Sequence, residues 1–321
     1  MTSFYNGKQV LILGGAGFLA SHLEPKLLEA GANAYLADNF SRGRKRDDCI
    51  NADVSDVPEM RMIISYYKPD IIFNLAAWVA GVIYNQKNHG EMFTKNLAVQ
   101  SAPLQVAAEL GVERFVQVSS ACVYSPEHNH PAIECNGHKG EPVAANIGYS
   151  LAKRMGERLA VWAHQELDLH TVIVRPSNLV GERDYFDERA HVVPALIRKC
   201  YEQDPIQFYG TGEEVREFLY AGDCADGLMA AGEHGRAGEA YNLGTGGASA
   251  VTIRRLFDII LELTLADISH KKIQIIEQDH DAGDPARWSC ERRASEDLGW
   301  CAETTLIEML ERTVKWYNEQ H

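Results

Sequence analysis

Two side chains four positions apart, Tyr149 and Lys153, form the strongest candidate for acid–base chemistry. At the start of a helix this spacing places the phenol and the ammonium on one face. A free tyrosine, with a pKa of about 10, is a poor base at neutral pH, but a nearby cation favours the phenolate. Ser119 and Ser120 come earlier, at the end of a predicted strand, where open α/β sheets place their ligand sites. The pattern predicts a proton-transfer site.

A glycine-rich turn follows the first predicted strand and is typical of a dinucleotide site. Gly14, Gly15 and Gly17 come directly after the run Val10–Leu13 and before a helix, with Ala20 at the third small position of the pattern. Glycines let the backbone approach a pyrophosphate closely, and a helix N-terminus adds free N–H groups and a positive dipole end. The turn therefore predicts a bound nicotinamide dinucleotide.

The end of the second predicted strand indicates which dinucleotide is bound. Asp38, followed by Asn39, can accept hydrogen bonds from the ribose hydroxyls and would repel a 2′-phosphate, which favours NAD over NADP. Four basic residues shortly afterwards could instead neutralise that phosphate: Arg42, Arg44, Lys45 and Arg46.

Two further strand ends are placed to touch the cofactor. Asp53 and Val54 would lie beside the adenine, and Leu75, Ala76 and Ala77 would pass under the pyrophosphate. Ordinary packing at a strand end explains both segments equally well.

These side chains need a sheet that brings several strand ends together. Short apolar runs alternate with helical stretches through the first half, and continuous apolar runs are typical of parallel strands covered on both faces. The alternation predicts an α/β fold with a Rossmann-type doubly wound parallel sheet. The predicted strands are Gln9–Leu13, Ala34–Ala37, Ile71–Leu75, Phe115–Ser119 and Thr171–Arg175, and the predicted helices include Gln100–Leu110 and Tyr149–Leu167.

The pattern changes after residue 176, where short strands and frequent glycine, proline and aromatic residues begin. We expect residues 1–176 to form an NAD-binding Rossmann domain, to which a segment near 218–245 returns. Residues 177–321 would form a smaller mixed substrate lobe, with short strands at Ile206–Tyr209 and Ile273–Ile276 and a last helix from Thr304 to Gln320.

Composition excludes several classes of function. The 321 residues carry a formal net charge of −14, and the pI is about 5.3, which argues against nucleic acid or an anionic membrane as a partner. No apolar stretch has the length of a membrane span or signal segment. The seven cysteines form no CxxC pair, so we expect reduced thiols in a cytoplasm.

One loop carries residue types that suit zinc, namely His128, His130, Cys135 and His138. Their spacing matches no closed zinc site. We therefore expect a solvated loop near the substrate entrance and no bound metal.

With these motifs in place, the chain resembles the extended short-chain dehydrogenase/reductase family, the NAD-dependent nucleotide-sugar epimerases and dehydratases. The resemblance covers nearly the whole chain. It is carried by Gly14–Ala20, Asn74–Ala77, Ser119–Tyr124, Tyr149–Lys153, Arg175–Gly181, Tyr209–Asp223 and Asn242–Gly246.

The resemblance implies a role for each motif. Tyr149 would exchange a proton with a sugar hydroxyl while a hydride passes to or from the nicotinamide, Ser120 would hold the same oxygen, and Lys153 would bind the nicotinamide ribose. Substrate contacts are implied for Asn178, Val192, Arg216 and Arg287. Cofactor contacts are implied for Gly14, Gly17, Phe18, Leu19, Asp38, Asn39, Asp53, Val54, Leu75, Ala76, Ala77, Tyr149, Lys153 and Pro176.

Two residues narrow the resemblance. The string Ser119–Cys122 is similar to GDP-mannose 3,5-epimerases, and the stretch Asp184–Lys199, with His191, looks like GDP-fucose synthases. In both families a cysteine matching Cys122 is half of an acid/base pair, and in fucose synthases the residue matching His191 is the other half. Inversion beside a C4 ketone needs such a pair, one group on each face of the sugar.

We therefore expect an NAD-dependent epimerase of a nucleotide-diphosphate sugar, with GDP implied by resemblance alone. Cys122 and His191 would invert C3 or C5 after Tyr149 assists oxidation at C4. The alternatives are a simple 4-epimerase, an NADPH-consuming epimerase/reductase of the fucose-synthase type, and a non-catalytic NAD-sensing module. The family also implies a homodimer through the helices near Gln100–Leu110 and Tyr149–Leu167.

Overall fold

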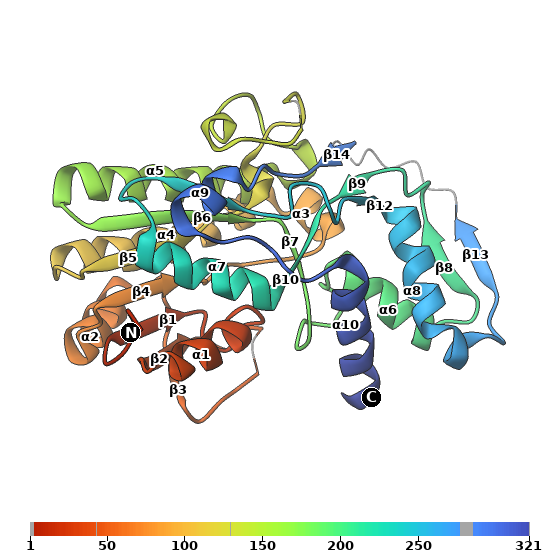
Figure 1. Cartoon of the computed structure of the whole chain (residues 1–321), viewed down its shortest axis with the longest axis horizontal. Helices are drawn as coiled ribbons and strands as arrows, with labels where there is room; N and C mark the ends of the chain where they lie inside the picture. Colours follow the sequence, from red (N-terminus) through yellow and green to blue (C-terminus); the bar gives the residue numbers. More distant parts are fainter. Residues whose placement is uncertain (1–2, 43, 129, 277–284, 321) are drawn as a thin grey trace.

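The computed structural model describes residues 3–42, 44–128, 130–276 and 285–320, and its central feature is a seven-stranded parallel sheet (Figure 1). The strand order is β11-β6-β5-β4-β1-β2-β3. The chain therefore winds outward from β1 in one direction and then returns to continue in the other, which confirms the predicted doubly wound α/β fold. The strands are β1 (Gln9–Leu13), β2 (Asn33–Asp38), β3 (Cys49–Asn51), β4 (Ile71–Asn74), β5 (Arg114–Val118), β6 (His170–Pro176) and β11 (Ala240–Leu243).

Helices cover both faces of this sheet. Successive residues of β1 alternate between the faces: Val10 and Ile12 pack in one core, Leu11 and Leu13 in the other. The first core also takes α1 (Ala20–Glu29), α7 (Ala221–His234) and α9 (Arg292–Leu298), and the second takes α2 (Val57–Tyr67), α4 (His89–Glu109) and α5 (Ile147–Leu167). Burial on both faces explains why the strands are continuously apolar.

A second lobe with its own apolar core lies at one end of the sheet, on the right in Figure 1. Its helices are α6 (Val192–Glu202), α8 (Ile253–Ile268) and α10 (Leu306–Gln320). Its strands pair as β8 (Ile206–Tyr209) with β13 (Ile273–Ile276), and as β12 (Val251–Thr252) with β9 (Val215–Arg216) and β14 (Ala286–Arg287). Between the lobes, β7 (Asn178–Val180) pairs with β10 (Phe218–Tyr220). The short helix α3 (Val82–Lys87) comes before α4 in the chain.

Helix α4 is longer than the sequence indicated. We expected a helix from Gln100, but it begins at His89 and continues through Pro103. Asn96 and Gln100 are fully buried on it and bond to backbone, Asn96 to Trp78 and Gln100 to Ala152. Because these buried side chains are polar, they interrupt the apolar periodicity that marks a buried helix face.

Candidate active site

The glycine-rich turn between β1 and α1 is packed tightly against the neighbouring strand ends. The N–H groups of Gly14 and Gly15 donate to the Ala37 carbonyl at the end of β2. Gly14 has a φ of +77°, and a Cβ on it would lie 2.9 Å from the backbone nitrogen of Ala76, after β4. Only glycine fits this position without strain. The turn thus lies at the carboxyl edge, where β1, β2 and β4 end.

Asp38 is held at this edge by backbone donors. One carboxylate oxygen accepts from the Ala16 N–H at 3.1 Å, and the other accepts from the Phe40 N–H at 2.8 Å. The carboxylate therefore lies beside the glycine-rich turn, as a ribose-binding residue must.

The other residues predicted to bind the cofactor surround the same edge. Phe18 and Leu19 lie at the start of α1, where Leu19 occupies the N-cap position without a side-chain cap. Val54 and Ala76 are buried, Leu75 and Ala77 are half-buried, and Pro176 ends β6. Asn39 and Asp53 are exposed, and each carboxyl or amide oxygen accepts from the backbone N–H two residues later. That these residues contact a cofactor stays a prediction.

Tyr149, Ser120 and Lys153 come together at the carboxyl edge beyond β5. Tyr149 lies in the first turn of α5 and is hydrogen-bonded to the Ser120 side chain. The Lys153 ammonium, 5.7 Å from the centre of the Tyr149 ring, donates to the Val118 carbonyl at 2.7 Å. Burial raises the pKa of Tyr149 and lowers the pKa of Lys153 to about 8. Both shifts favour the neutral side chains, because burial disfavours charge.

Cys122 lies close enough to Tyr149 and Lys153 for a charge on its thiol to change their pKa values. It is the middle residue of a short 3-10 helix, Ala121–Val123, and its N–H donates to the Ser120 Oγ at 3.1 Å. The thiol is half-buried, and its negative form would raise the pKa values of both Tyr149 and Lys153. This position suits a group that acts on the same substrate as Tyr149.

His191 occupies the N-cap position of α6 and is exposed. The Arg42 guanidinium and the Asp187 carboxylate act on its imidazole with opposite charges. The charged groups that act on His191 are thus Arg42 and Asp187. Its pairing with Cys122 across a sugar stays a prediction.

The residues predicted to bind the substrate lie on β7, β9, β14 and α6, and one of them, Arg287, acts on Tyr149. Arg216 of β9 and Arg287 of β14 are register partners, and the charge of buried Arg287 lowers the pKa of Tyr149. Asn178 begins β7, and its side-chain amide donates to the Glu217 carbonyl at 2.7 Å. Val192, the first residue of α6, is half-buried. Arg287, on the strand paired with that of Arg216, therefore lies near the phenol.

A buried ionic network lies beneath this site and was not expected from the sequence. Glu157, one turn after Lys153, pairs with Arg175 through two hydrogen bonds of 2.7 and 2.8 Å. It also accepts from Ser119 and from His138. The i, i+4 spacing of Lys153 and Glu157 was the available signal. His138, expected in a solvated loop, instead ties that loop to α5.

Glu217 is a second buried carboxylate that sequence reasoning missed. Its oxygens accept from three surrounding segments, through Ser177, through Thr245 and Gly247, and through Ser289. Because it lies next to Arg216, this carboxylate fixes the backbone that carries the predicted phosphate ligands.

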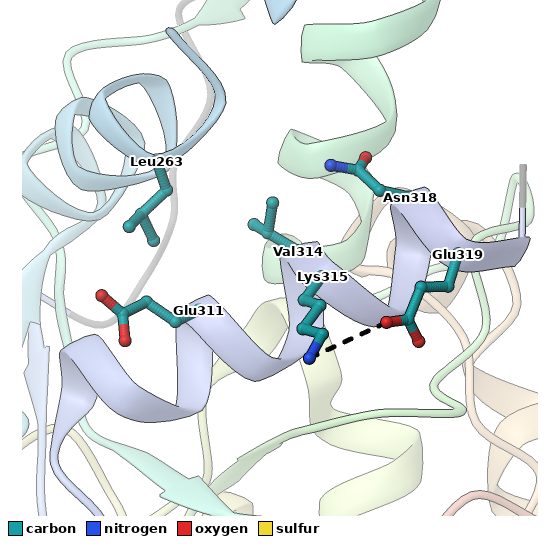
Figure 2. A pocket seen from close by; sticks show the side chains of 6 residues that line it. All are labelled: Leu263, Glu311, Val314, Lys315, Asn318 and Glu319. Carbon is teal, nitrogen blue, oxygen red and sulfur yellow. Dashed lines mark ion pairs between the residues drawn. The ribbon is translucent and has the colours of Figure 1, made fainter. Parts of the chain in front are cut away.

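A clustered metal site and a membrane-spanning helix are both absent from the described part of the chain. Among residues 3–42, 44–128, 130–276 and 285–320, no group of three or more His, Cys, Asp or Glu side chains is arranged to hold a metal. In the same part of the chain, no helix has the length and apolar character needed to cross a membrane. A recess of about 360 Å³ lies on α10, away from the predicted site, and Figure 2 shows its lining: Leu263, Glu311, Val314, Lys315, Asn318 and Glu319.

Comparison with known proteins identifies relatives along almost the whole chain. The chain is 27% identical to a GDP-L-fucose synthase of Sinorhizobium fredii over 308 residues, covering 94% of this chain and 92% of that protein. It is 28% identical to a putative UDP-glucose 4-epimerase of Methanocaldococcus jannaschii over 315 residues, covering 96% and 97%. Among solved structures, the UDP-glucose 4-epimerase of Thermotoga maritima with UDP-glucose superimposes with a TM-score of 0.87 at 25% identity, covering 97% of this chain and 99% of that one.

A match to a protein-family model identifies the family of this chain. Residues 10–244 match the NAD dependent epimerase/dehydratase family. The match includes the glycine-rich turn, Asp38, Ser120, Tyr149 and Lys153. The chain therefore belongs to this family and is an enzyme of the extended short-chain dehydrogenase/reductase type.

Proposed function

We propose that this enzyme is an NAD-dependent epimerase of a nucleotide-diphosphate sugar, and that the sugar is linked to GDP. The observation that carries the proposal is the Tyr149–Ser120 hydrogen bond beside Lys153, at the same sheet edge as the glycine-rich turn. Similarity to proteins named GDP-L-fucose synthase supports the choice of GDP.

The residues at the sheet edge fit a dinucleotide. The turn packs so closely at Gly14 that a Cβ would meet the Ala76 backbone, and the Asp38 carboxylate is aligned beside it. The start of α1 follows the turn and offers the free N–H groups that a pyrophosphate needs. Two of the basic residues that could accept a 2′-phosphate are already paired, Arg42 with Asp187 and Arg46 with Glu24. These pairs favour NAD over NADP.

The chain's own residues supply the proton chemistry. NAD held at this edge would supply the acceptor for the C4 hydride and the donor that returns it. Tyr149 takes the proton of the C4 hydroxyl while the C–H bond at C4 is broken, and Ser120 donates a hydrogen bond to the oxygen of that hydroxyl. The positive charge of Arg287 favours the phenolate against the effect of burial, and a protonated Lys153 beside the ring would act in the same direction. The proton returns from Tyr149 when the ketone is reduced.

Inversion at C3 or C5 needs a second pair of groups. In the proposal, the thiolate of Cys122 and the imidazole of His191 approach opposite faces of the 4-keto sugar. One removes the acidic proton beside the ketone, and the other donates a proton to the opposite face. The position of Cys122 next to Tyr149 supports its half of this role.

A simple 4-epimerase is the second candidate. It is favoured by the surroundings of His191, because the charges that act on this side chain are those of Arg42 and Asp187 and not that of Cys122, its proposed partner. The relatives named UDP-glucose 4-epimerase also support it. In this case Cys122 and His191 take no part in the chemistry.

Incubation with GDP- and UDP-sugars in heavy water, followed by NMR of the products, distinguishes the two. The proposal expects epimerised product with solvent deuterium at C3 or C5, and Cys122→Ser should abolish that exchange. Tyr149→Phe should lower turnover by about 10²–10⁴-fold, whereas Tyr209→Phe, which makes the same change at an exposed tyrosine, should not. Normal turnover by Tyr149→Phe would refute the mechanism.

We also propose a homodimer formed through α4 and α5. Leu110, at the end of α4, and Met155 and Trp162 of α5 are large apolar side chains that are 41%, 39% and 50% exposed. A dimer would cover them. A monomeric mass in solution would count against this. We further propose that the enzyme works in a reducing cytoplasm, where its seven cysteines would stay free thiols.

A further inference from the structure

The segment of residues 184–191, which we call the strap, reaches from the second lobe to the edge of the sheet. Its Tyr185 hydroxyl donates to the Ala16 carbonyl of the glycine-rich turn at 3.4 Å. Its Arg189 guanidinium lies 5.7 Å from the centre of the Trp78 ring, after β4. The strap therefore contacts two of the segments that form the predicted cofactor site.

The strongest link is an ion pair between Asp187 of the strap and Arg42 of the loop after β2. The Arg42 Nη2 lies 3.1 Å from one carboxylate oxygen of Asp187, and its Nε lies 3.4 Å from the other. The Nη1 donates to the Val79 carbonyl at 2.9 Å, and the guanidinium stacks on Tyr185 at 4.6 Å. All three nitrogens of Arg42 are thus engaged, and only 11% of its side chain is exposed.

Arg42 is four residues beyond Asp38, and both act on the same neighbour. The charges of Asp38 and Arg42 both influence the pKa of Tyr185, in opposite directions. An arginine this close to the ribose-binding carboxylate is well placed to take the 2′-phosphate of NADP, because its fork of donors matches phosphate geometry. Whether the enzyme can use Arg42 in this way depends on what else holds the guanidinium.

We propose that Asp187 is a specificity-determining residue of the cofactor site, which excludes NADP by holding Arg42. The inference rests on the proposed dependence on NAD. A 2′-phosphate would have to displace the Asp187 carboxylate from Arg42 and would lie close to two carboxylates, those of Asp38 and Asp187. NAD has no such group, so it binds with the ion pair intact.

Two observations support the assignment. The Arg42 charge holds the pKa of Asp187 below its ordinary value against the effect of burial, so the carboxylate stays ionised when a cofactor arrives. The two neighbouring arginines are also engaged, since Arg46 pairs with Glu24 and Asp48, and Arg44 lies over the Trp316 ring. Asp187 is thus the partner whose removal frees a phosphate-binding group beside Asp38.

The test measures binding and needs no sugar substrate. NADH and NADPH are titrated into the full chain, freed of co-purified nucleotide, and nicotinamide fluorescence gives both dissociation constants. In Asp187→Asn, which keeps the side-chain shape, the affinity for NADPH should rise at least about tenfold, while the affinity for NADH changes less than about threefold. The matched control is Glu188→Gln, which removes the same charge from an exposed position of the strap and should leave the preference unchanged.

A second variant shows that Arg42 causes the gain. In the double variant Arg42→Gln/Asp187→Asn the gain in NADPH affinity should disappear. The inference is overturned if Asp187→Asn keeps the wild-type preference, if Glu188→Gln shifts it equally, or if the gain persists without Arg42. If the wild-type chain binds neither dinucleotide, the proposed function fails first, and the inference fails with it.

Discussion

Replacing Glu157 by glutamine tests whether the buried network beneath Tyr149 and Lys153 depends on a charge. The carboxylate and its Arg175 partner are 1% and 3% exposed and share two hydrogen bonds. Glutamine keeps the volume and one acceptor oxygen but removes the negative charge. Arg175 would then remain buried with no counter-charge at its guanidinium.

The expected loss follows from the pKa of Glu157. Burial opposes ionisation, but the charge of Arg175 and the hydrogen bonds from His138 and Ser119 lower the pKa from 4.5 to about 2. At about 1.4 kcal/mol per pKa unit, the shift corresponds to about 3 kcal/mol of folding free energy. Breaking a buried ion pair by removing one partner costs a similar amount, about 3–5 kcal/mol. We therefore expect Glu157→Gln to lose about 3 kcal/mol at pH 7.

The sign of the pH dependence gives a second check. A carboxyl whose pKa is lower in the folded state contributes its full stability above the unfolded value and loses it as the pH falls. The difference between wild type and Glu157→Gln should therefore shrink between pH 4.5 and about pH 2.

Urea unfolding, followed by circular dichroism at pH 7 and at pH 3, measures both effects. The matched control is Glu262→Gln, which breaks an exposed pair with Arg255, in which the side chains are 65% and 54% exposed, and should cost less than about 1 kcal/mol. A loss below about 1 kcal/mol in Glu157→Gln, or a loss that does not change with pH, would refute the reasoning.

Two further predictions concern backbone strain and a second buried carboxyl. Gly14→Ala should lower the free energy of unfolding, measured with urea, by about 3 kcal/mol and weaken NADH binding, because φ is +77° and the new Cβ would meet Ala76. The control Gly111→Ala, at φ +69° in open space, should lower it by about 1 kcal/mol. Burial raises the pKa of Asp184 from 3.8 to about 7, so the folded chain holds a proton that the unfolded chain releases, and stability falls as pH rises through this window. At about 1.4 kcal/mol per pKa unit that fall amounts to about 4 kcal/mol between pH 4 and pH 8, and Asp184→Asn should remove it; identical pH profiles would contradict this.

The central strands β1, β4, β5 and β6 were predictable because they are buried on both faces. β1 was predicted with its observed bounds, and the predictions for β2, β4, β5 and β6 differ from the observed strands by a residue or so at their ends. A parallel strand covered on both sides is continuously apolar, so local sequence marks it clearly. The start of α4 was not predictable in this way, because buried Asn96 and Gln100 satisfy their polar groups through backbone contacts that only the folded chain provides.

The same distinction between local and long-range features applies to the candidate site. Tyr149 and Lys153 are four residues apart on one helix, so their spacing alone predicts a shared face. The effect of Arg287 on Tyr149 is different, since it depends on β14 lying beside β9 across the second lobe.

The sequence by itself therefore determined the features that depend on near neighbours in the chain: the glycine-rich turn, the carboxylate of Asp38, and the spacing of Tyr149 and Lys153. Only the tertiary structure decided which distant charges meet. Arg42 and Asp187 are 145 positions apart, and Glu157 and Arg175 lie on different elements. No local periodicity records such pairs, because they form only when the winding of the sheet and the second lobe bring their segments together.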